Sequence, residues 1–428
     1  MNEMDDERKV PGGRLGRFAR LAAVGVRTGA GMLVDRDGTS TAKSAAAVLG
    51  TLRGLAAKVG QMASYVDGVV PEAHREAYET SMKALRASAP KSSPASIRAA
   101  VEEALGAPID KVFARWDDVP IASASIGQVH GAQTPEGLEV AVKVQHPGII
   151  QAVESDLANA GILEGFVGVL GGKRFETKKM LEVIRTRFRE ELDYELEARR
   201  LQLFAQLHAG DETVRIPAFI ASHSSKRVLT TALVRGLDFD EACASSPDER
   251  RAWAHTMWRF VFKGTLVGGM LNADPHPGNY IFHDGGAVTF LDYGCIQEMD
   301  DSRRTRAREV HFAALARDEA RFRRAVADMV ASKPGALQDA ALEYTRRCFE
   351  PLFASPHRIE RPYAASLVDG MKEMSHVARK VKEHEFFTMP PDMLFVNRLQ
   401  FGFYSVLARL DVEGDYAAVE REFLGATT

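Results

Sequence analysis

Two aspartates and an asparagine in the middle of the chain have the residue types and spacing of a site that handles phosphate. Asp274 lies within Leu271–Asn279, Asn279 follows it five positions later, and Asp292 ends an apolar run just before Gly294. A carboxylate at Asp274 could orient or deprotonate an attacking hydroxyl or water, and the oxygen atoms of Asn279 and Asp292 suit Mg²⁺. The alternative is a series of turns, because Asp, Asn, Pro and Gly all favour turns for local reasons.

The same order of residues matches the active-site motifs of protein kinases. Asp-x-x-x-x-Asn followed by an Asp-Phe-Gly-like triplet is the pattern of a kinase catalytic loop and its metal motif. Upstream, Val140–Lys143 closely matches the strand whose lysine grips the α and β phosphates. Ala122–Val129 aligns with the loop that covers the phosphates, although alanines replace its first two glycines. We therefore predict that ATP or ADP contacts Ala122, Ser123, Ala124, Ser125 and Lys143, with Mg²⁺ held by Asn279 and Asp292.

Strands and a helix must bring these residues together. Alternating apolar residues predict a strand over Leu138–Val144 after a turn at Thr134–Gly137, and a buried strand over Arg227–Val234. Thr231 and Leu233 would lie near the adenine edge, ahead of a hinge at Gly236. A kinase lysine also needs a helix carboxylate. Five acids lie among the eight residues 190–197, and helical spacing alone does not say which of them reaches the lysine.

Apolar patterns also predict several other helices. Gly and Pro end a short one over Ser96–Leu105. Arg250–Gly269 reads as an apolar helix with Trp253 and Trp258 in the core, and an arginine-rich helix follows Gly294. A final helix is expected over about Asp392–Leu410.

Composition limits the class of protein. Hydrophobic residues make up 45% of the 428 residues, and the formal net charge of −3 argues against a bulk nucleic-acid binder. The length predicts more than one packed unit, here a helical extension over 1–90, a small lobe over 91–236 and a helical lobe over 237–428. Three scattered cysteines, no long apolar run and an acidic start predict a cytoplasmic protein without a transmembrane segment.

The first 90 residues carry two further patterns. Four arginines between Arg14 and Arg27 interleave with apolar residues, as in a basic amphipathic helix. Such a helix would suit an anionic membrane surface or, equally, would dock on the body of the protein. Lys58 and Gln61 lie three positions apart in a second predicted helix and project from one face. Spacing alone favours a solvated pair there.

In combination, these motifs resemble the ABC1/ADCK/UbiB family of atypical, protein-kinase-like proteins. The similarity runs in order from about residue 15 to beyond 300, and a Lys-x-Gly-Gln helix together with Ala-Asp-Pro-His-Pro-Gly-Asn is strongly diagnostic. The segments that carry it are Lys58–Gln61, Ala122–His130, Val140–Lys143, Glu191–Tyr194, Ala273–Asn279 and Leu291–Gly294. The resemblance implies an α+β, protein-kinase-like two-lobed fold, with a small antiparallel sheet in the N-lobe and a helical C-lobe. It also implies that the N-terminal helical extension packs over the active site.

The resemblance assigns residues that spacing leaves open. It makes Lys58 and Gln61 site residues, pairs Glu197 with the phosphate-binding lysine, and turns Glu191 and Asp193 towards the extension. The alanine-rich loop is also a mark of the family, and is linked there with altered nucleotide handling.

Three residues depart from the family pattern. Asn272 stands where the family usually has His, Ala232 where an acidic residue is common near the hinge, and Tyr293 where the metal motif usually has Phe. Asn keeps a donor and an acceptor but does not titrate near neutral pH. None of the three removes a phosphate or metal contact, so they bear on nucleotide preference and regulation.

The function implied by the resemblance is an ATP-binding ATPase or phosphotransferase that supports ubiquinone or other isoprenoid-lipid biosynthesis. Its expected partners are nucleotide, an anionic membrane at whose inner face it would rest, lipid intermediates and lipid-biosynthetic enzymes. Positioning and charge neutralisation by Lys143, Asp274 and Mg²⁺ would supply most of the catalysis. Two alternatives stay open: a kinase for a protein or a small alcohol, and a non-catalytic nucleotide-binding scaffold. The Lys58 helix argues against a protein acceptor, and the intact acidic and basic site residues argue against a scaffold.

Overall fold

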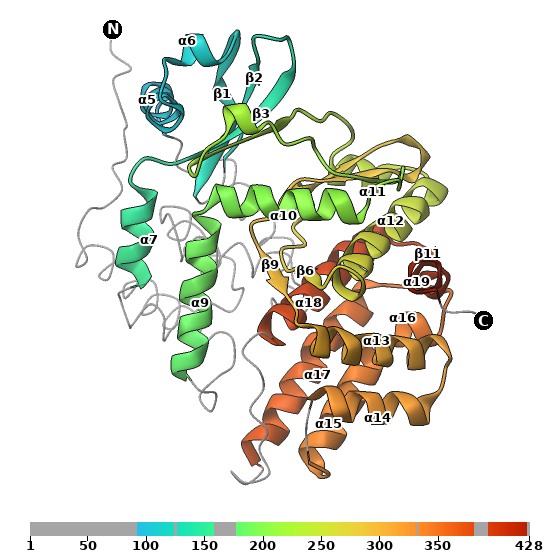
Figure 1. Ribbon diagram of the computed structural model, residues 1–428. Coiled ribbons are helices and arrows are strands. Elements are labelled where there is room, and N and C mark those ends of the chain that lie inside the picture. The colour runs from blue at the N-terminus through green and yellow to red at the C-terminus, as the bar shows by residue number, and fades with distance from the viewer. Residues whose placement is uncertain (1–91, 124–125, 158–176, 331–332, 381–392, 426–428) are drawn as a thin grey trace, which may run out of the picture.

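A four-stranded antiparallel sheet forms the centre of the smaller lobe (Figure 1). The computed structural model describes residues 92–123, 126–157, 177–330, 333–380 and 393–425. The strands in spatial order are β1 (Arg115–Ser123), β2 (Gly127–Gln133), β3 (Glu139–Gln145) and β5 (Val228–Ala232). In the turn between β2 and β3, the Gly137 N–H donates to the Thr134 carbonyl at 2.9 Å. The predicted turn and both predicted strands are confirmed.

The strand register separates the two faces of this sheet, because directly paired residues point to the same side. Lys143 pairs with Val129 on β2 and Leu229 on β5, and Ala141 pairs with Thr231. These residues share one face. The alternate residues on β3 are valines that pack with α5 (Pro94–Leu105) and α6 (Ile109–Val112) in an apolar core. The Lys143 face is thus turned away from α5.

Helix α5 begins and ends as its sequence predicts. The Ser93 side chain accepts a hydrogen bond from the Ser96 N–H, and Pro94 occupies the first turn. Gly106 ends the helix in the left-handed region with φ of 74°. Ile97 and Val101, four residues apart, are buried against the sheet.

Two of the helices between strands β3 and β5 together contact both the sheet and the larger lobe. After α7 (Ile149–Leu157) the chain forms α9 (Thr177–Glu191) and then α10 (Tyr194–Leu207), which run in different directions (Figure 1). Asp193 starts α10 anew, because its side chain accepts from the Leu196 N–H at 3.1 Å. The buried stripe of α10 includes Tyr194, Glu197, Ala198, Leu201 and Phe204, so one face of this helix belongs to both lobes.

Helix α12 (Pro247–Leu266) is central to the larger lobe. A capping box between Ser246 and Glu249 starts it earlier than predicted. Trp253 and Trp258 are each 1% exposed, which confirms that both belong to the core. The other helices of this lobe are α11 (Phe239–Ala244), α13 (Asp301–Leu315), α14 (Glu319–Val330), α15 (Ala336–Cys348), α16 (Glu350–Phe353), α17 (Arg361–Lys380), α18 (Met393–Leu410) and α19 (Tyr416–Leu424).

The prediction that the helix ending at Leu410 is the last one is wrong, because α19 follows it. Asp415 caps α19 by accepting from the Ala418 N–H at 2.9 Å. The Tyr416 ring lies 4.4 Å from the Trp258 ring, and the Trp258 indole N–H donates to the buried Glu420 carboxylate at 3.0 Å. The buried face of α19 therefore packs this helix against α12.

Short strands position the two loops that carry the predicted chemistry. β6 (Met270–Asn272) pairs with β9 (Ile296–Glu298), β7 (Tyr280–Phe282) pairs with β8 (Val288–Phe290), and β4 (Val214–Arg215) lies parallel to β8. β10 (His357–Arg358) pairs with β11 (Glu413–Gly414), and three short 3₁₀ helices cover Ala221–His223, Pro277–Asn279 and Asp284–Gly286. Residues 273–279 join β6 to β7, and residues 291–295 join β8 to β9. The predicted arginine-rich helix is α13, but strand β9 comes before it.

Some predictions fall on parts of the chain that the structure does not describe. These are the helical extension over residues 1–90 with its basic helix, the Lys58 and Gln61 pair, and Ala124 and Ser125 of the covering loop. None of the helices within the described ranges has the length and apolar character needed to cross a membrane.

Candidate functional site

A lysine from the sheet and a glutamate from α10 form the central contact of the site. The Lys143 Nζ donates to the Glu197 Oε1 at 2.8 Å and to the Oε2 at 2.9 Å. The side chain of Glu197 is 2% exposed and that of Lys143 is 22% exposed. The structure thus brings together Lys143 and one of the five acids that the sequence left open.

The surroundings of the pair keep the lysine charged. Burial alone would lower the pKa of the Lys143 ammonium, but the Glu197 and Asp292 carboxylates outweigh it and hold that pKa above its ordinary value. Burial raises the pKa of the Glu197 carboxyl, and the ammonium together with the Tyr293 backbone N–H opposes this shift. The two hydrogen bonds below 3 Å make this a short, charge-assisted contact between the two lobes' shared helix and the sheet.

The other acids of the run have different places. Glu190 is bound by two arginines, Asp193 caps α10, and Glu195 is exposed. Glu191, at the end of α9, is 8% exposed. Asp193 and Glu191 are therefore near the start of α10, and their predicted partners Lys58 and Gln61 lie outside the described residues.

Tyr194 was not predicted to shape the site, yet it lies beside the lysine. Its ring centroid is 5.0 Å from the Lys143 Nζ, and the residue is fully buried. A Cβ on Gly127 would come within 2.4 Å of the Val144 carbonyl oxygen and 2.8 Å of the Tyr194 hydroxyl, so only glycine fits there. The signal for Tyr194 was its position three residues before Glu197, which puts both on one helical face.

Asp292 approaches the same ammonium from the larger lobe. Its Oδ2 lies 3.9 Å from the Lys143 Nζ, and its side chain is 31% exposed. The Gly294 N–H donates to the Oδ1 at 2.8 Å and fixes the orientation of the carboxylate. A cation that bound Asp292 would therefore lie close to the lysine.

The loop that contains Asp274 is held to its neighbour by backbone and amide contacts. The Asn279 Nδ2 donates to the Asp274 carbonyl at 3.2 Å, and the His276 N–H donates to the same carbonyl at 2.8 Å. The Leu291 N–H donates to the Asn279 carbonyl at 3.0 Å, which joins this loop to the one with Asp292. Because its nitrogen is committed to the loop, Asn279 offers its side-chain oxygen as the atom suited to a cation.

Asn272, the first departure from the family pattern, ties the two loops together. Its Nδ2 donates to the Asp292 carbonyl at 3.1 Å, and its Oδ1 accepts from the Asp274 N–H at 3.1 Å. One side chain with both a donor and an acceptor is needed for this bridge. The motif pattern predicts a bearing of Asn272 on nucleotide preference and regulation, but it contains no signal for this bridge.

The two other departures are accommodated without a change at the Lys143 face. The ring of Tyr293 is buried, and its additional hydroxyl donates to the Phe290 carbonyl at 3.0 Å. Ala232 pairs with Val140, which lies on the face covered by α5. An acidic side chain at position 232 would therefore not share the face of Lys143.

The remaining predicted nucleotide contacts are divided between the two faces of the sheet. Thr231, through Ala141, and Ala122, through Val129, lie on the Lys143 face. Ser123 pairs with Gln128 on the opposite face, so only its backbone could meet a phosphate. The Leu233 N–H already donates to the Glu139 carbonyl at 3.0 Å. The Leu233 carbonyl is therefore the backbone group of this residue that could accept a hydrogen bond from adenine.

Comparison with known proteins identifies the family of this chain. Residues 84–326 match the ABC1 atypical kinase-like domain. The chain is 30% identical over 316 residues to the mitochondrial atypical kinase COQ8B of Rattus norvegicus, which covers 69% of this chain and 58% of that protein. It is 29% identical over 437 residues to the mitochondrial atypical kinase coq-8 of Caenorhabditis elegans, covering 95% of this chain and 56% of that protein. The chain thus spans a little under three fifths of the length of these relatives.

A solved structure supports the fold. The Rv3197–erythromycin complex from Mycobacterium tuberculosis is similar with a TM-score of 0.59 at 21% sequence identity, over 96% of this chain and 97% of that one. This likeness and the antiparallel sheet above a helical lobe agree with the predicted α+β, kinase-like architecture. Since the family match includes Lys143, Glu197 and Asp292 and more than half of the sequence, the chain belongs to the ABC1 atypical kinase-like family.

Proposed function

We propose that this protein binds ATP or ADP with Mg²⁺ where Lys143 of its smaller lobe meets Asp292 of its larger lobe, and acts as an ATPase or phosphotransferase. One observation carries the proposal. The Lys143 ammonium is bonded to Glu197 at 2.8 Å and also lies 3.9 Å from the Asp292 carboxylate. A phosphate-binding cation of the small lobe and an acid of the large lobe therefore meet at one point, as phosphoryl transfer requires.

The donor atoms of the larger lobe fit Mg²⁺. Asp292 presents a partly exposed carboxylate and Asn279 an amide oxygen. Proteins usually hold Mg²⁺ with one or two such oxygens plus phosphate oxygens and waters. The described residues contain no group of three or more His, Cys, Asp or Glu side chains that could hold a metal by themselves. When bound, Mg²⁺ would neutralise charge on the phosphates.

The chain's own residues would then divide the work. Lys143 binds the α and β phosphates, Glu197 keeps its ammonium in place, and Asp274 orients the attacking hydroxyl or water. Asn272 keeps Asp274 and Asp292 in register. The adenine base would lie along the Lys143 face of the sheet, near Thr231, Ala122 and the Leu233 carbonyl. The covering loop of Ser123, Ala124 and Ser125 would lie over the phosphates.

The extension before residue 91 has a role in the same proposal. Lys58 and Gln61 would meet Glu191 and Asp193 and cover the site where a protein acceptor would otherwise lie. The curated relatives are called mitochondrial atypical kinases. In accordance with the family, we infer support of ubiquinone or other isoprenoid-lipid biosynthesis, with the protein peripheral at the inner face of a membrane and in contact with lipids or lipid-biosynthetic enzymes.

Nucleotide binding and turnover by the purified full chain test the proposal. Lys143→Met and Asp292→Asn should each weaken Mg²⁺-dependent ATP binding measured by calorimetry. Lys111→Met and Asp284→Asn change exposed residues outside the predicted site and serve as matched controls. If both site variants bound Mg²⁺–ATP as tightly as their controls, the proposed site would be wrong.

Turnover with labelled ATP separates the reaction types. The protein is incubated with and without anionic liposomes and quinone-precursor-like lipids, and label is followed in free phosphate, lipid and protein. Free phosphate indicates an ATPase, and label in an added lipid or protein indicates a phosphotransferase. Tight binding without turnover under every condition would contradict the enzymatic proposal and leave a nucleotide-binding scaffold.

A further inference from the structure

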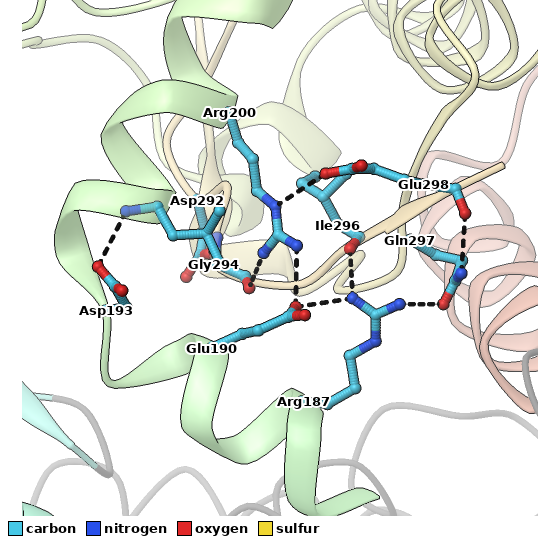
Figure 2. A network of polar contacts seen from close by, with 10 residues as sticks. Arg187, Glu190, Asp193, Arg200, Asp292, Gly294, Ile296, Gln297 and Glu298 are labelled. Carbon is cyan, nitrogen blue, oxygen red and sulfur yellow. Dashed lines mark hydrogen bonds and ion pairs between the residues drawn. The ribbon is translucent and has the colours of Figure 1, made fainter. Parts of the chain in front are cut away.

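Two arginines on α9 and α10 hold the segment that follows Asp292 (Figure 2). Arg200 donates from Nη1 to the Gly294 carbonyl at 3.2 Å and from Nη2 to the Glu190 carboxylate at 2.8 Å. Arg187 donates from Nη1 to the Ile296 carbonyl at 2.8 Å and to the same Glu190 oxygen at 2.7 Å. Its Nη2 donates to the Gln297 side chain. Glu190 is therefore the shared acceptor that holds both guanidinium groups against β9.

This network reaches the carboxylate of Asp292 through one residue. Gly294 accepts from Arg200 with its carbonyl and donates with its N–H to the Asp292 Oδ1 at 2.8 Å. Glu197, on the same helix as Arg200, accepts from the Lys143 Nζ at 2.8 Å. Glu197 and Arg200 are three residues apart, so one face of α10 carries both the partner of Lys143 and the arginine that binds the Gly294 carbonyl. The helix that pairs with the phosphate-binding lysine thus also fixes the loop of the proposed metal ligand.

The same contacts extend to the loop that contains Asp274. Ile296, bound by Arg187, pairs with Asn272 across β9 and β6. The Ala273 N–H donates to the Cys295 carbonyl at 2.9 Å, one residue further along. Both proposed catalytic loops are therefore connected to α9 and α10.

The burial of Arg200 argues for a directional role. The residue is 3% exposed, and its Nε lies 4.0 Å from the Glu298 carboxylate without a hydrogen bond. A buried charge is costly, and apolar residues of similar volume often replace a buried ion pair without loss of stability. A planar guanidinium, however, can hold a carbonyl and a carboxylate in fixed directions at the same time.

We propose that Arg200, together with Glu190 and Arg187, is a positioning device that orients Asp292 for a divalent cation bound with nucleotide. The inference rests on the proposed function, because it takes Asp292 as the cation ligand. The three residues touch neither nucleotide nor cation. They act through the backbone of residues 294–297, and they couple α9 and α10 to the cation site.

The test measures cation affinity and backbone order separately in the full chain. Arg200→Lys keeps the positive charge but loses the planar guanidinium that binds two acceptors at once. It should raise the Mg²⁺ concentration needed for half-maximal ATP binding by about 10-fold or more, as replacement of groups that orient metal ligands does. Nucleotide binding in the presence of chelator should not change. Arg199→Gln, an exposed neighbour on the same helix, should leave the Mg²⁺ midpoint where it is.

Hydrogen exchange in metal-free and nucleotide-free protein gives the second readout. Residues 294–298 should exchange faster in Arg200→Lys than in wild type or in Arg199→Gln, while α12 is unchanged. Arg187→Lys and Glu190→Gln break the network at other points and should shift both readouts in the same direction. They keep the test decisive if the Arg200 variant does not fold.

The outcomes distinguish this inference from the proposed function. A loss of thermal stability without a change in the Mg²⁺ midpoint or in exchange over 294–298 would make the network merely structural and overturn the inference. If Asp292→Asn itself left the Mg²⁺ midpoint unchanged, the proposed metal ligand would be wrong. In that case the inference would fall with its ligand, whatever the exchange over residues 294–298 shows. If Asp292→Asn does raise the midpoint, unchanged exchange over 294–298 in Arg200→Lys overturns the coupling on its own.

Discussion

Glu197→Gln is the substitution that addresses the Lys143 pair most selectively. The side chain keeps its size and one acceptor, but the ammonium loses a carboxylate that it contacts at 2.8 and 2.9 Å. Charge-assisted hydrogen bonds contribute about 1.5–3 kcal/mol, and removal of one member of a buried ion pair costs about 3–5 kcal/mol. Because Gln retains an acceptor and Lys143 can turn towards Asp292, we expect the lower part of this range, about 2 kcal/mol.

Urea unfolding of the full chain measures this change, and Mg²⁺–ATP binding measures its effect on the site. Lys143 that turns to Asp292, 3.9 Å away, would compete with a cation for that carboxylate and weaken nucleotide binding. Glu195→Gln is the matched control, because it removes an exposed acid from the same first turn of α10. It should change the free energy of unfolding by no more than about 0.5 kcal/mol. Equal stability and equal nucleotide affinity in Glu197→Gln and Glu195→Gln would refute the reasoning.

Three other predictions follow from the geometry. Asn272→Leu removes the bridge between the two loops and should lower kcat for ATP turnover by about 10-fold or more. The KM for ATP should change little. An unchanged kcat would show that the bridge has no role in turnover. Burial between two phenylalanines, with Lys263 nearby, lowers the pKa of His208 to about 4, so the unfolded chain takes up a proton that the folded chain does not. Stability should therefore fall as the pH drops from about 6.5 to 4, by up to about 3 kcal/mol, and urea unfolding of His208→Leu should lack this part of the slope. Gly127→Ala places a Cβ 2.4 Å from a backbone carbonyl and should cost about 1–3 kcal/mol in thermal unfolding; wild-type stability would show that β2 can shift.

The parts of the fold that sequence predicts are those with local causes. The strand around Lys143 and its hairpin follow from alternation and a turn, and α5 follows from a serine cap, a proline and a terminal glycine. Strand β9, by contrast, has three residues and exists because it pairs with β6, about 25 positions earlier in the chain. Helix α19 was missed because its one apolar face has meaning only against α12.

The site shows the same division. Motif spacing predicts Lys143, Asp274, Asn279 and Asp292 as site residues, because each belongs to a short, locally recognisable motif. It does not reveal Arg200, which reads as one more charge on a polar helix. Its role depends on the break between α9 and α10 and on the return of residues 294–298 to that point. Tertiary contacts of this kind leave no periodic signal in the sequence.

A double-mutant cycle on Mg²⁺–ATP binding is the most direct test of the convergence of Lys143 and Asp292. Calorimetry would give the affinity of wild type, Lys143→Met, Asp292→Asn and the double variant, with thermal unfolding to verify that each is folded. Residues that act on the same phosphates and cation should be coupled, so the loss in the double variant should differ from the sum of the single losses by about 1 kcal/mol or more. Strictly additive losses, or no loss in either single variant, would contradict a shared nucleotide and cation site.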